Sequence, residues 1–253
     1  MKKNLVYAVA MAGLGTRFTR AGYTLPKYML RAAGATLFEH SLRSLPLEPA
    51  RKIIFIALKE HQERYGLEGF IVSALDGICG GAAFRPDFEL VLLDAPTRGQ
   101  AETVMRAKDA VPPGSGLAIY NIDTRFLSDT LLKKLSGPGK KDGVLGSFKL
   151  AAKDPKWSFA RLGPGATVLA VAEKVQISDN ALTGLYHFTD AADFFSAAGE
   201  ALAGPAAGEL YVAPLYNTLI AAGREFVLDE ARGITPLGTP EDVERVKAYG
   251  LDG

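Results

Sequence analysis

Residues 11–18 read MAGLGTRF, and residues 25–27 read LPK a short distance further on. The glycines of this loop follow residues 5–11, a short and almost wholly apolar run of β-prone residues. Such a run is typical of a strand that a parallel sheet buries on both faces. A glycine loop leaving that strand can bring backbone N–H donors close to a phosphate. The stretch therefore predicts an open α/β sheet with a phosphate site at the carboxyl edge of its first strand.

Strand and helix patterns alternate through the first part of the chain. Buried-strand patterns recur at residues 52–58, 89–94 and 116–123, and helical patterns lie at residues 36–45, 59–75 and 99–111, the second of them interrupted by glycine. This alternation predicts a Rossmann-like, doubly wound sheet, mixed but mainly parallel, with right-handed crossovers. Helices on both faces of that sheet would make a three-layer α/β/α fold.

The pattern changes after about residue 143. Strand-like runs separated by Pro, Gly and Asp follow at residues 143–150, 158–163, 167–174 and 181–188, with helical stretches at residues 190–202, 213–223 and 239–249. Short strands in this spacing indicate a mixed or antiparallel extension. We expect a single domain over residues 1–253, with a nucleotide-binding half at 1–142, a substrate-side elaboration at 143–235 and a C-terminal helix within 236–253.

The composition restricts the class of protein. The formal net charge is +1 at pH 7 and like charges do not cluster, so neither a nucleic acid nor a membrane surface is expected as a partner. Residues 1–13 resemble a secretory leader only briefly, because the apolar run breaks at Gly13 without a cleavage pattern. Since no apolar run approaches the roughly 18 residues of a membrane span, we expect a cytoplasmic protein. The single cysteine, Cys79, excludes an internal disulfide and a cysteine metal cage.

Two familiar phosphate motifs do not fit the glycine loop. A dinucleotide fingerprint requires a third glycine where Phe18 stands, and a P-loop requires G-x-x-x-x-G-K-[ST]. A tight turn without a ligand remains the plainest alternative for the glycines alone. Arg17 and Lys27 make that alternative weaker, because a guanidinium fork and a compact ammonium on one short loop suit a polyphosphate.

In this loop the sequence resembles the sugar-phosphate nucleotidyltransferases, also called nucleotide-sugar pyrophosphorylases, whose signature is G-x-G-[TS]-R followed by P-K. Further segments resemble the family in the same order along the chain: PTRGQAETV at residues 96–104, YNID at 120–123, and DPKWSFARLG with AEK and TGLY at 154–163, 172–174 and 183–186. The resemblance covers nearly the whole chain. It implies a nucleotide-diphospho-sugar transferase type of fold, and its compact form resembles members of capsule and surface-polysaccharide pathways.

The resemblance also implies an activity and a set of site residues. A nucleoside triphosphate (NTP) and a sugar 1-phosphate would give a nucleotide-sugar and pyrophosphate with Mg²⁺ as cofactor, and a homo-oligomer is possible. Catalytic roles would belong to Arg17, Lys27 and Asp123, with Asp123 as the metal ligand. The remaining implied residues are Ala12, Gly13, Leu14, Gly15, Thr16, Gly99 and Gln100 for the nucleotide, and Glu173, Lys174, Gly184 and Tyr186 for the sugar phosphate.

Some of these residues have plainer interpretations. Asp123 could instead cap a helix beginning in residues 124–135, Glu173 and Lys174 could simply end a solvated strand, and Tyr186 could belong to the core. Many family members carry a second metal-binding Asp in a late W-x-D-x-G segment, whereas residues 234–242 here read ITPLGTPED with Leu237 or a neighbour at that place. Asp229 or Asp242 could take the place of that acid. The histidines, His40, His61 and His187, lack metal-ligand spacing.

Three other functions remain to be distinguished. Residues 26–42 also resemble the cytidylyltransferases of methylerythritol phosphate, which favours an alcohol phosphate as acceptor, although the AEK and TGLY segments argue against it. A non-catalytic nucleotide- or sugar-binding module of the same fold would be marked by loss of Arg17, Lys27 or Asp123, and all are present. A nicotinamide-dependent oxidoreductase is disfavoured because the glycine spacing does not fit.

Overall fold

The computed structural model describes residues 4–80, 85–137, 141–204 and 208–251. The first residues of the leader-like stretch, 1–3, and the last of the C-terminal region, 252–253, therefore lie outside the described residues. The strands are β1 (Leu5–Ala10), β2 (Arg31–Ala32), β3 (Ala35–Thr36), β4 (Ala50–Leu58), β5 (Asp87–Leu93), β6 (Gly116–Asn121), β7 (Thr124–Leu127), β8 (Gly143–Lys149), β9 (Ser158–Leu162), β10 (Val168–Glu173), β11 (Asn180–Phe188), β12 (Phe226–Glu230) and β13 (Arg232–Pro236).

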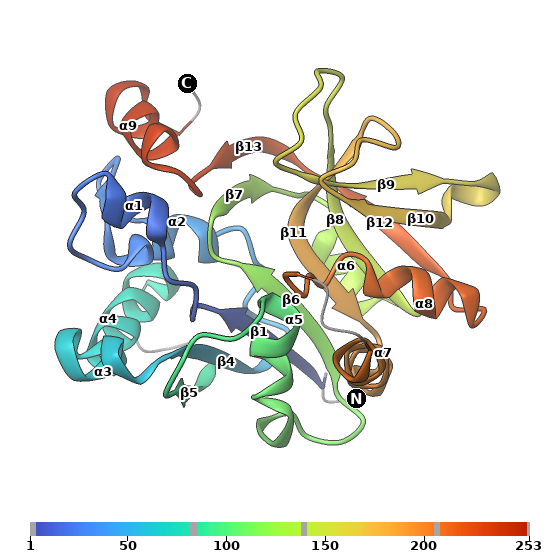
Figure 1. Ribbon diagram of the computed structural model, residues 1–253, viewed down its shortest axis with the longest axis horizontal. Coiled ribbons are helices and arrows are strands. Elements are labelled where there is room, and N and C mark those ends of the chain that lie inside the picture. Colours follow the sequence, from blue (N-terminus) through green and yellow to red (C-terminus); the bar gives the residue numbers. More distant parts are fainter. Residues whose placement is uncertain (1–3, 81–84, 138–140, 205–207, 252–253) are drawn as a thin grey trace.

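The α-helices are α1 (Thr16–Arg20), α2 (Leu37–Leu42), α3 (Lys59–Tyr65), α4 (Leu67–Cys79), α5 (Gln100–Met105), α6 (Leu131–Ser136), α7 (Ala191–Ala203), α8 (Leu215–Ala221) and α9 (Pro240–Tyr249). Short 3-10 turns lie at η1 (Lys27–Met29), η3 (Lys108–Ala110) and η4 (Pro164–Ala166). Figure 1 shows their arrangement.

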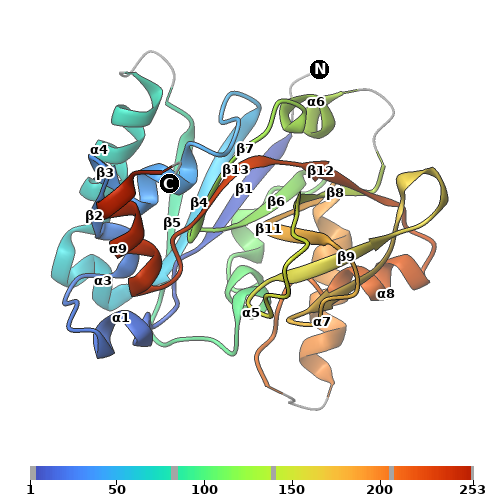
Figure 2. The same ribbon diagram turned by 90° about the horizontal axis from the view of Figure 1, so that it is seen from above.

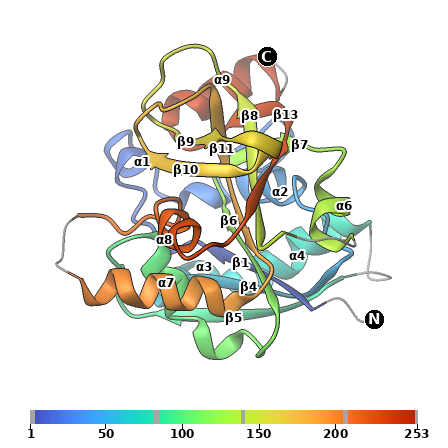
Figure 3. The same cartoon turned by 90° about the vertical axis from the view of Figure 1, so that its right-hand side faces the viewer.

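One sheet organises the described part of the chain, with nine strands in the order β10-β9-β11-β6-β1-β4-β5 and with β8 and β12 branching from β11. Strands β6, β1, β4 and β5 run parallel, whereas β11 runs antiparallel to β6. The antiparallel pair β9 and β10 lies at the opposite end of the sheet from β5 (Figure 3). The predicted Rossmann-like, mixed and mainly parallel sheet is confirmed.

The first strand explains why its sequence is apolar throughout. Val6 and Ala8 pack into the core cluster that contains α5, α7 and α8, whereas Tyr7 and Val9 pack into the cluster that contains α2, α4 and α6. Figure 2 shows α7 and α8 on one side of the sheet and α4 and α6 on the other. Because successive side chains point to opposite faces and both faces are covered, neither face of β1 has polar positions. The three-layer α/β/α arrangement follows.

One local prediction is confirmed and one alternative is excluded. The helix expected over residues 59–75 is interrupted by a glycine as predicted, because Gly66 adopts a left-handed conformation with φ of 61° and divides α3 from α4. The alternative that Asp123 caps a helix is wrong, because residues 124–127 form β7, which pairs with β13, and α6 begins only at Leu131. Asp123 instead lies in the turn between β6 and β7.

The glycine loop and the C-terminal helix meet at the carboxyl edge of the sheet. Thr239 is the N-cap of helix α9, and its side chain forms a capping box with that of Asp242. Its buried Val243 and Val246 pack with Phe18 of α1 and with Leu237. Helix α9 therefore lies beside the glycine loop that follows β1, although the two segments are far apart in the sequence (Figure 1).

Candidate active site

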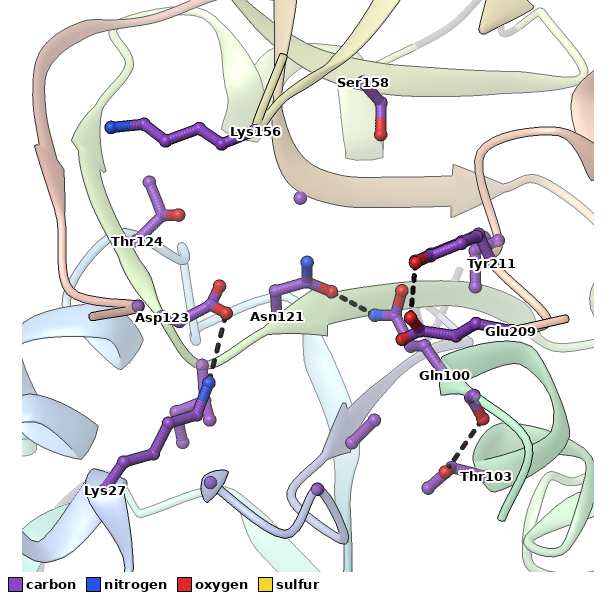
Figure 4. A pocket seen from close by; sticks show the side chains of 18 of the residues that line it. Lys27, Gln100, Thr103, Asn121, Asp123, Thr124, Lys156, Ser158, Glu209 and Tyr211 are labelled. Atoms are coloured by element: carbon purple, nitrogen blue, oxygen red, sulfur yellow. Dashed lines mark hydrogen bonds and ion pairs between the residues drawn. The ribbon is translucent and has the colours of Figure 1, made fainter. Parts of the chain in front are cut away.

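A cavity of about 690 Å³ opens at the carboxyl edge of the parallel strands. Its walls come from the glycine loop, the β6–β7 turn, the residues before α5, and strands β9 to β11. All of the site residues predicted from the sequence line it: Ala12, Gly13, Leu14, Gly15, Thr16, Arg17, Lys27, Gly99, Gln100, Asp123, Glu173, Lys174, Gly184 and Tyr186. The fold thus brings segments from both halves of the chain to one concave surface (Figure 4).

The glycine loop presents an open backbone to this cavity. A Cβ atom placed on Gly13 would meet no heavy atom within 4 Å, so the protein itself does not require glycine there. Gly15 is different, because its φ of 59° is left-handed and turns the chain into α1. The Arg17 side chain, on the first turn of α1, is exposed at the rim.

Lys27 and Asp123 form an ion pair on the cavity wall. The Lys27 Nζ lies 3.1 Å from the Asp123 Oδ2, and the two side chains are 24% and 31% exposed. Figure 4 shows the lysine approaching the carboxylate from the glycine-loop side. A half-buried cation and anion at this distance attract each other and still remain accessible to a ligand that enters the cavity.

The segment before α5 forms the second wall. Gly99 has no room for a side chain, because its Cβ would lie 2.5 Å from the Leu210 carbonyl oxygen. Glu102 bonds the guanidinium groups of Arg98 and Arg106 and accepts from the Arg98 backbone N–H, which holds the segment in place. Next to it, the Gln100 side-chain amide donates to the Asn121 side-chain carbonyl. A nucleobase edge could meet this amide pair, which offers both donors and acceptors.

Glu173 is embedded in a hydrogen-bonded wall on the sugar side. Its carboxylate accepts from the Ser158 hydroxyl, and that hydroxyl lies 3.5 Å from the buried Tyr186 hydroxyl. Burial raises the pKa of Glu173 and outweighs the hydrogen bond from Ser158, which lowers it. Gly184, two residues before Tyr186, has a φ of 86° and leaves space for the Asn121 side chain. The plainer interpretations hold in part, because Glu173 is the last residue of β10 and Tyr186 belongs to the buried core, but both residues also line the cavity.

Lys174 follows directly and adopts a left-handed backbone with φ of 57°, which is uncommon for a residue with a side chain. Its Nζ donates to the Tyr211 hydroxyl and lies 4.4 Å from the centre of that ring. The Tyr211 hydroxyl in turn donates to the Glu209 carboxylate. The hydrogen bond to Tyr211, followed by the nearby charges of Glu209 and Glu173, raises the pKa of Lys174.

The three positions considered for a second metal-binding acid behave differently. Asp229 is fully buried and bonds Lys134 and Thr130, away from the cavity lining. Leu237 belongs to the core, and its backbone N–H donates to the Asp123 carbonyl at 2.8 Å. Asp242 lines the cavity, but its Oδ2 accepts the Thr239 backbone N–H in the capping box. Asp123 is therefore the best placed carboxylate for a cation.

Several cavity residues escaped the sequence analysis. Asn121 and Ser158 lie inside the segments that carried the resemblance, but neither residue type signals a site by itself. Lys156 extends over the opening from the loop before β9 (Figure 4). Glu209 and Tyr211 come from the connection between α7 and α8, where only a Glu-x-Tyr spacing in a loop could have drawn attention.

Within the residues that the structure describes, metal-ligating side chains do not cluster, and His40 and His61 have other contacts. No cluster of three or more His, Cys, Asp or Glu side chains there could hold a metal ion by itself. His40 is buried with its Nε2 2.8 Å from the Ala32 carbonyl, and His61 bonds the Tyr28 hydroxyl. Over the same residues, no helix combines the length and the apolar character that crossing a membrane requires.

Solved structures of nucleotidyltransferases share this architecture. The nucleoside-diphosphate-sugar pyrophosphorylase from Vibrio cholerae RC9 is 33% identical, with a TM-score of 0.78 over 97% of this chain and 100% of that one. A UDP-glucose pyrophosphorylase complexed with UDP-glucose is 17% identical (TM-score 0.75, 98% of each chain). The inositol-1-phosphate CTP transferase from T. maritima is 15% identical (TM-score 0.75, 100% of this chain and 96% of that one).

The likeness to the Vibrio cholerae protein identifies the class of protein as nucleotidyltransferases, and the other two structures share its Rossmann-like α/β fold. At 33% identity over 97% of its length, the chain belongs to the family of nucleoside-diphosphate-sugar pyrophosphorylases. No protein-family model matches the sequence, and the comparison with curated proteins finds no match.

Proposed function

We propose that this protein transfers a nucleotidyl group from a nucleoside triphosphate to a sugar 1-phosphate, with release of pyrophosphate. One observation supports this most strongly. The glycine loop, the Lys27–Asp123 pair, the amide pair before α5 and the Glu173 wall all line a single cavity of about 690 Å³. Such a volume suits two phosphorylated ligands lying side by side.

The reaction is an in-line displacement. An oxygen of the sugar phosphate forms a bond to the α-phosphorus, and the bond from that phosphorus to the oxygen bridging to the β-phosphorus breaks. The bonding electrons leave with pyrophosphate. A phosphate monoester with a second pKa of about 6 is mostly dianionic at neutral pH, so the nucleophile needs no general base. Catalysis then consists of positioning and charge neutralisation.

The phosphate side of the cavity supplies that neutralisation. Lys27 would move its contact from Asp123 to the α-phosphate, where negative charge increases as the phosphorus becomes five-coordinate. Arg17, exposed at the rim, would hold the departing pyrophosphate through its planar fork. The open backbone of residues 12–16 would donate N–H groups to the remaining phosphate oxygens.

Asp123 and the substrate phosphates would coordinate Mg²⁺ together, so the protein need not supply all of its ligands. Asp123 offers a half-buried carboxylate on the cavity wall, and Mg²⁺ often binds through one or two carboxylates together with substrate phosphates and water. When bound, the ion would withdraw charge from the phosphate oxygens. Asp123 would hold the ion, and Lys27 would bind the oxygens of the α-phosphate beside it.

The acceptor would occupy the sugar side. Glu173 would accept hydrogen bonds from sugar hydroxyls, Tyr186 and Gly184 would shape the pocket, and Lys174 would pair with the acceptor phosphate. We extend the proposal to the compact enzymes of capsule and surface-polysaccharide synthesis, acting in the cytoplasm where nucleoside triphosphates are available. Small molecules are then its partners, and self-association is possible.

The test is pyrophosphate release from CTP, UTP, GTP, ATP and dTTP, each with and without Mg²⁺, against a panel of sugar 1-phosphates. Asp123→Ala should abolish release, while Asp229→Asn, a carboxylate outside the cavity lining, should retain it if the variant folds. Thermal unfolding of both variants identifies any loss of folding. Release that requires one triphosphate, one sugar phosphate and Mg²⁺ supports the proposal.

Other outcomes would favour the alternatives. Release only with alcohol phosphates, such as inositol 1-phosphate or methylerythritol phosphate, would replace the sugar acceptor by an alcohol phosphate. Triphosphate binding by calorimetry without release from any acceptor would identify a non-catalytic module and overturn the proposal.

A further inference from the structure

Residues 209–211 join the two sides of the cavity. The Leu210 backbone N–H donates to the Arg98 carbonyl at 2.9 Å, and the Leu210 carbonyl accepts the Ala101 N–H at 3.0 Å. Gly99 lies so close to Leu210 that no other residue fits without displacement. The backbone of this short segment is therefore fixed against the nucleotide-side wall.

The side chains on either side of Leu210 turn toward the acceptor side. Lys174 donates to the Tyr211 hydroxyl, and that hydroxyl donates to Glu209, so the three groups form a continuous hydrogen-bond chain. All three side chains line the cavity, and Figure 4 shows the Glu209–Tyr211 contact at its wall. The orientation of the bonds is consistent, because the ammonium can only donate and the carboxylate can only accept.

We propose that Tyr211 and Glu209 are positioning residues for Lys174, which hold its ammonium at a set distance from the nucleotide-side wall through the Leu210 backbone. The inference rests on the proposed function, which assigns Lys174 to the acceptor phosphate. Residues 209–211 contact both the nucleotide-side wall and Lys174. They would therefore align the attacking phosphate of the acceptor with the α-phosphate of the triphosphate.

The flexibility of lysine gives such a device a physical purpose. A lysine has a flexible four-carbon stem, and restricting it costs side-chain entropy. Lys174 is exposed and follows the end of β10 in a left-handed backbone conformation. A tyrosine ring with a rigid attachment, hydrogen bonded on one side and 4.4 Å from the ammonium, restricts the lysine before the acceptor arrives.

The experiment uses Tyr211→Phe, which keeps the ring and removes the hydroxyl, with the surface variant Tyr249→Phe as the matched control. We expect the KM for the sugar 1-phosphate that supports release to rise about tenfold, the scale of one hydrogen bond to a charged group. The KM for the triphosphate should stay within about twofold of wild type, since the Leu210 backbone contacts remain. In a Lys174→Ala background, Tyr211→Phe should have no further effect.

An independent measurement follows Lys174 itself. Lysines are ¹³C-dimethylated and titrated by NMR, with the Lys174 resonance assigned from its loss in Lys174→Arg. The pKa of Lys174 should be lower in Tyr211→Phe than in wild type, because the hydrogen bond that raises it is absent. An unchanged titration, or additive kinetic effects of the two substitutions, would overturn the positioning role. A wild-type protein inactive with every acceptor would instead refute the proposed function, and the titration would still decide whether Tyr211 acts on Lys174.

Discussion

The two sides of the cavity are built in opposite ways. On the phosphate side, Gly13 leaves empty space, Arg17 is exposed and Lys27 pairs with the half-buried carboxylate of Asp123. On the acceptor side, Glu173 bonds Ser158, and Lys174 bonds Tyr211, which bonds Glu209. The phosphate side thus keeps its donors for a ligand, whereas the acceptor side is organised in advance. The difference suits a reaction in which a highly charged, strongly hydrated donor must be neutralised while a less charged acceptor is oriented.

The largest expected effect tests the phosphate side of the cavity. Lys27→Ala should lower kcat/KM for pyrophosphate release by about 100- to 1000-fold, the scale for loss of one group that stabilises transition-state charge. The matched control is Lys52→Ala, whose lysine is 22% exposed and pairs with Glu89 on the surface, compared with 24% for Lys27. Similar losses in both variants would show that the effect is not specific to the cavity.

The next effect concerns the contact between the two sides. Gly99→Ala would place a methyl group 2.5 Å from the Leu210 carbonyl oxygen, so we expect the free energy of unfolding to fall by about 2 kcal/mol. Urea denaturation measures this. If Gly99→Ala had the same urea midpoint as wild type, residues 208–212 would have to move aside at no cost. The two sides of the cavity would then not be rigidly joined.

The pH dependence of stability tests the acceptor side of the cavity. Because burial raises the pKa of Glu173, the folded protein binds this proton more tightly than the unfolded chain does. The carboxyl therefore contributes stability at low pH, and the contribution is lost as the pH rises through the raised pKa of the folded state. Glu173→Gln should lose less stability than wild type as the pH rises above the ordinary pKa of a glutamate, about 4. Equal pH profiles, measured by thermal unfolding with Glu89→Gln as the surface control, would contradict an embedded Glu173.

The smallest stability effect is expected at Gly13. Since a Cβ there meets nothing within 4 Å, Gly13→Ala should change the free energy of unfolding by less than about 0.5 kcal/mol. Triphosphate binding measured by calorimetry should nevertheless weaken, because the methyl group occupies space that the phosphates would use. Tight binding by this variant would show that the phosphates lie elsewhere in the cavity.

Much of the fold could be predicted because its signals are local. The apolar runs at residues 5–11 and 52–58, the capping pattern at Thr239 and the glycine loop each depend on neighbours in sequence. The interruption by glycine expected within residues 59–75 is a local signal of the same kind, and the structure places it at Gly66. The candidate site residues could be named only where they belonged to a motif.

The α/β class follows from the periodicity of the sequence, and the family and the residues of its signature segments follow from the resemblance of short motifs. The packed fold was needed to show which of the late acids reaches the cavity, why Gly99 must be glycine, and that Lys174 bonds Tyr211, which in turn bonds Glu209. These depend on contacts between residues far apart in the chain, such as Leu210 against Gly99. No local pattern encodes a contact of that kind, because it exists only once the sheet and its connections have been packed together.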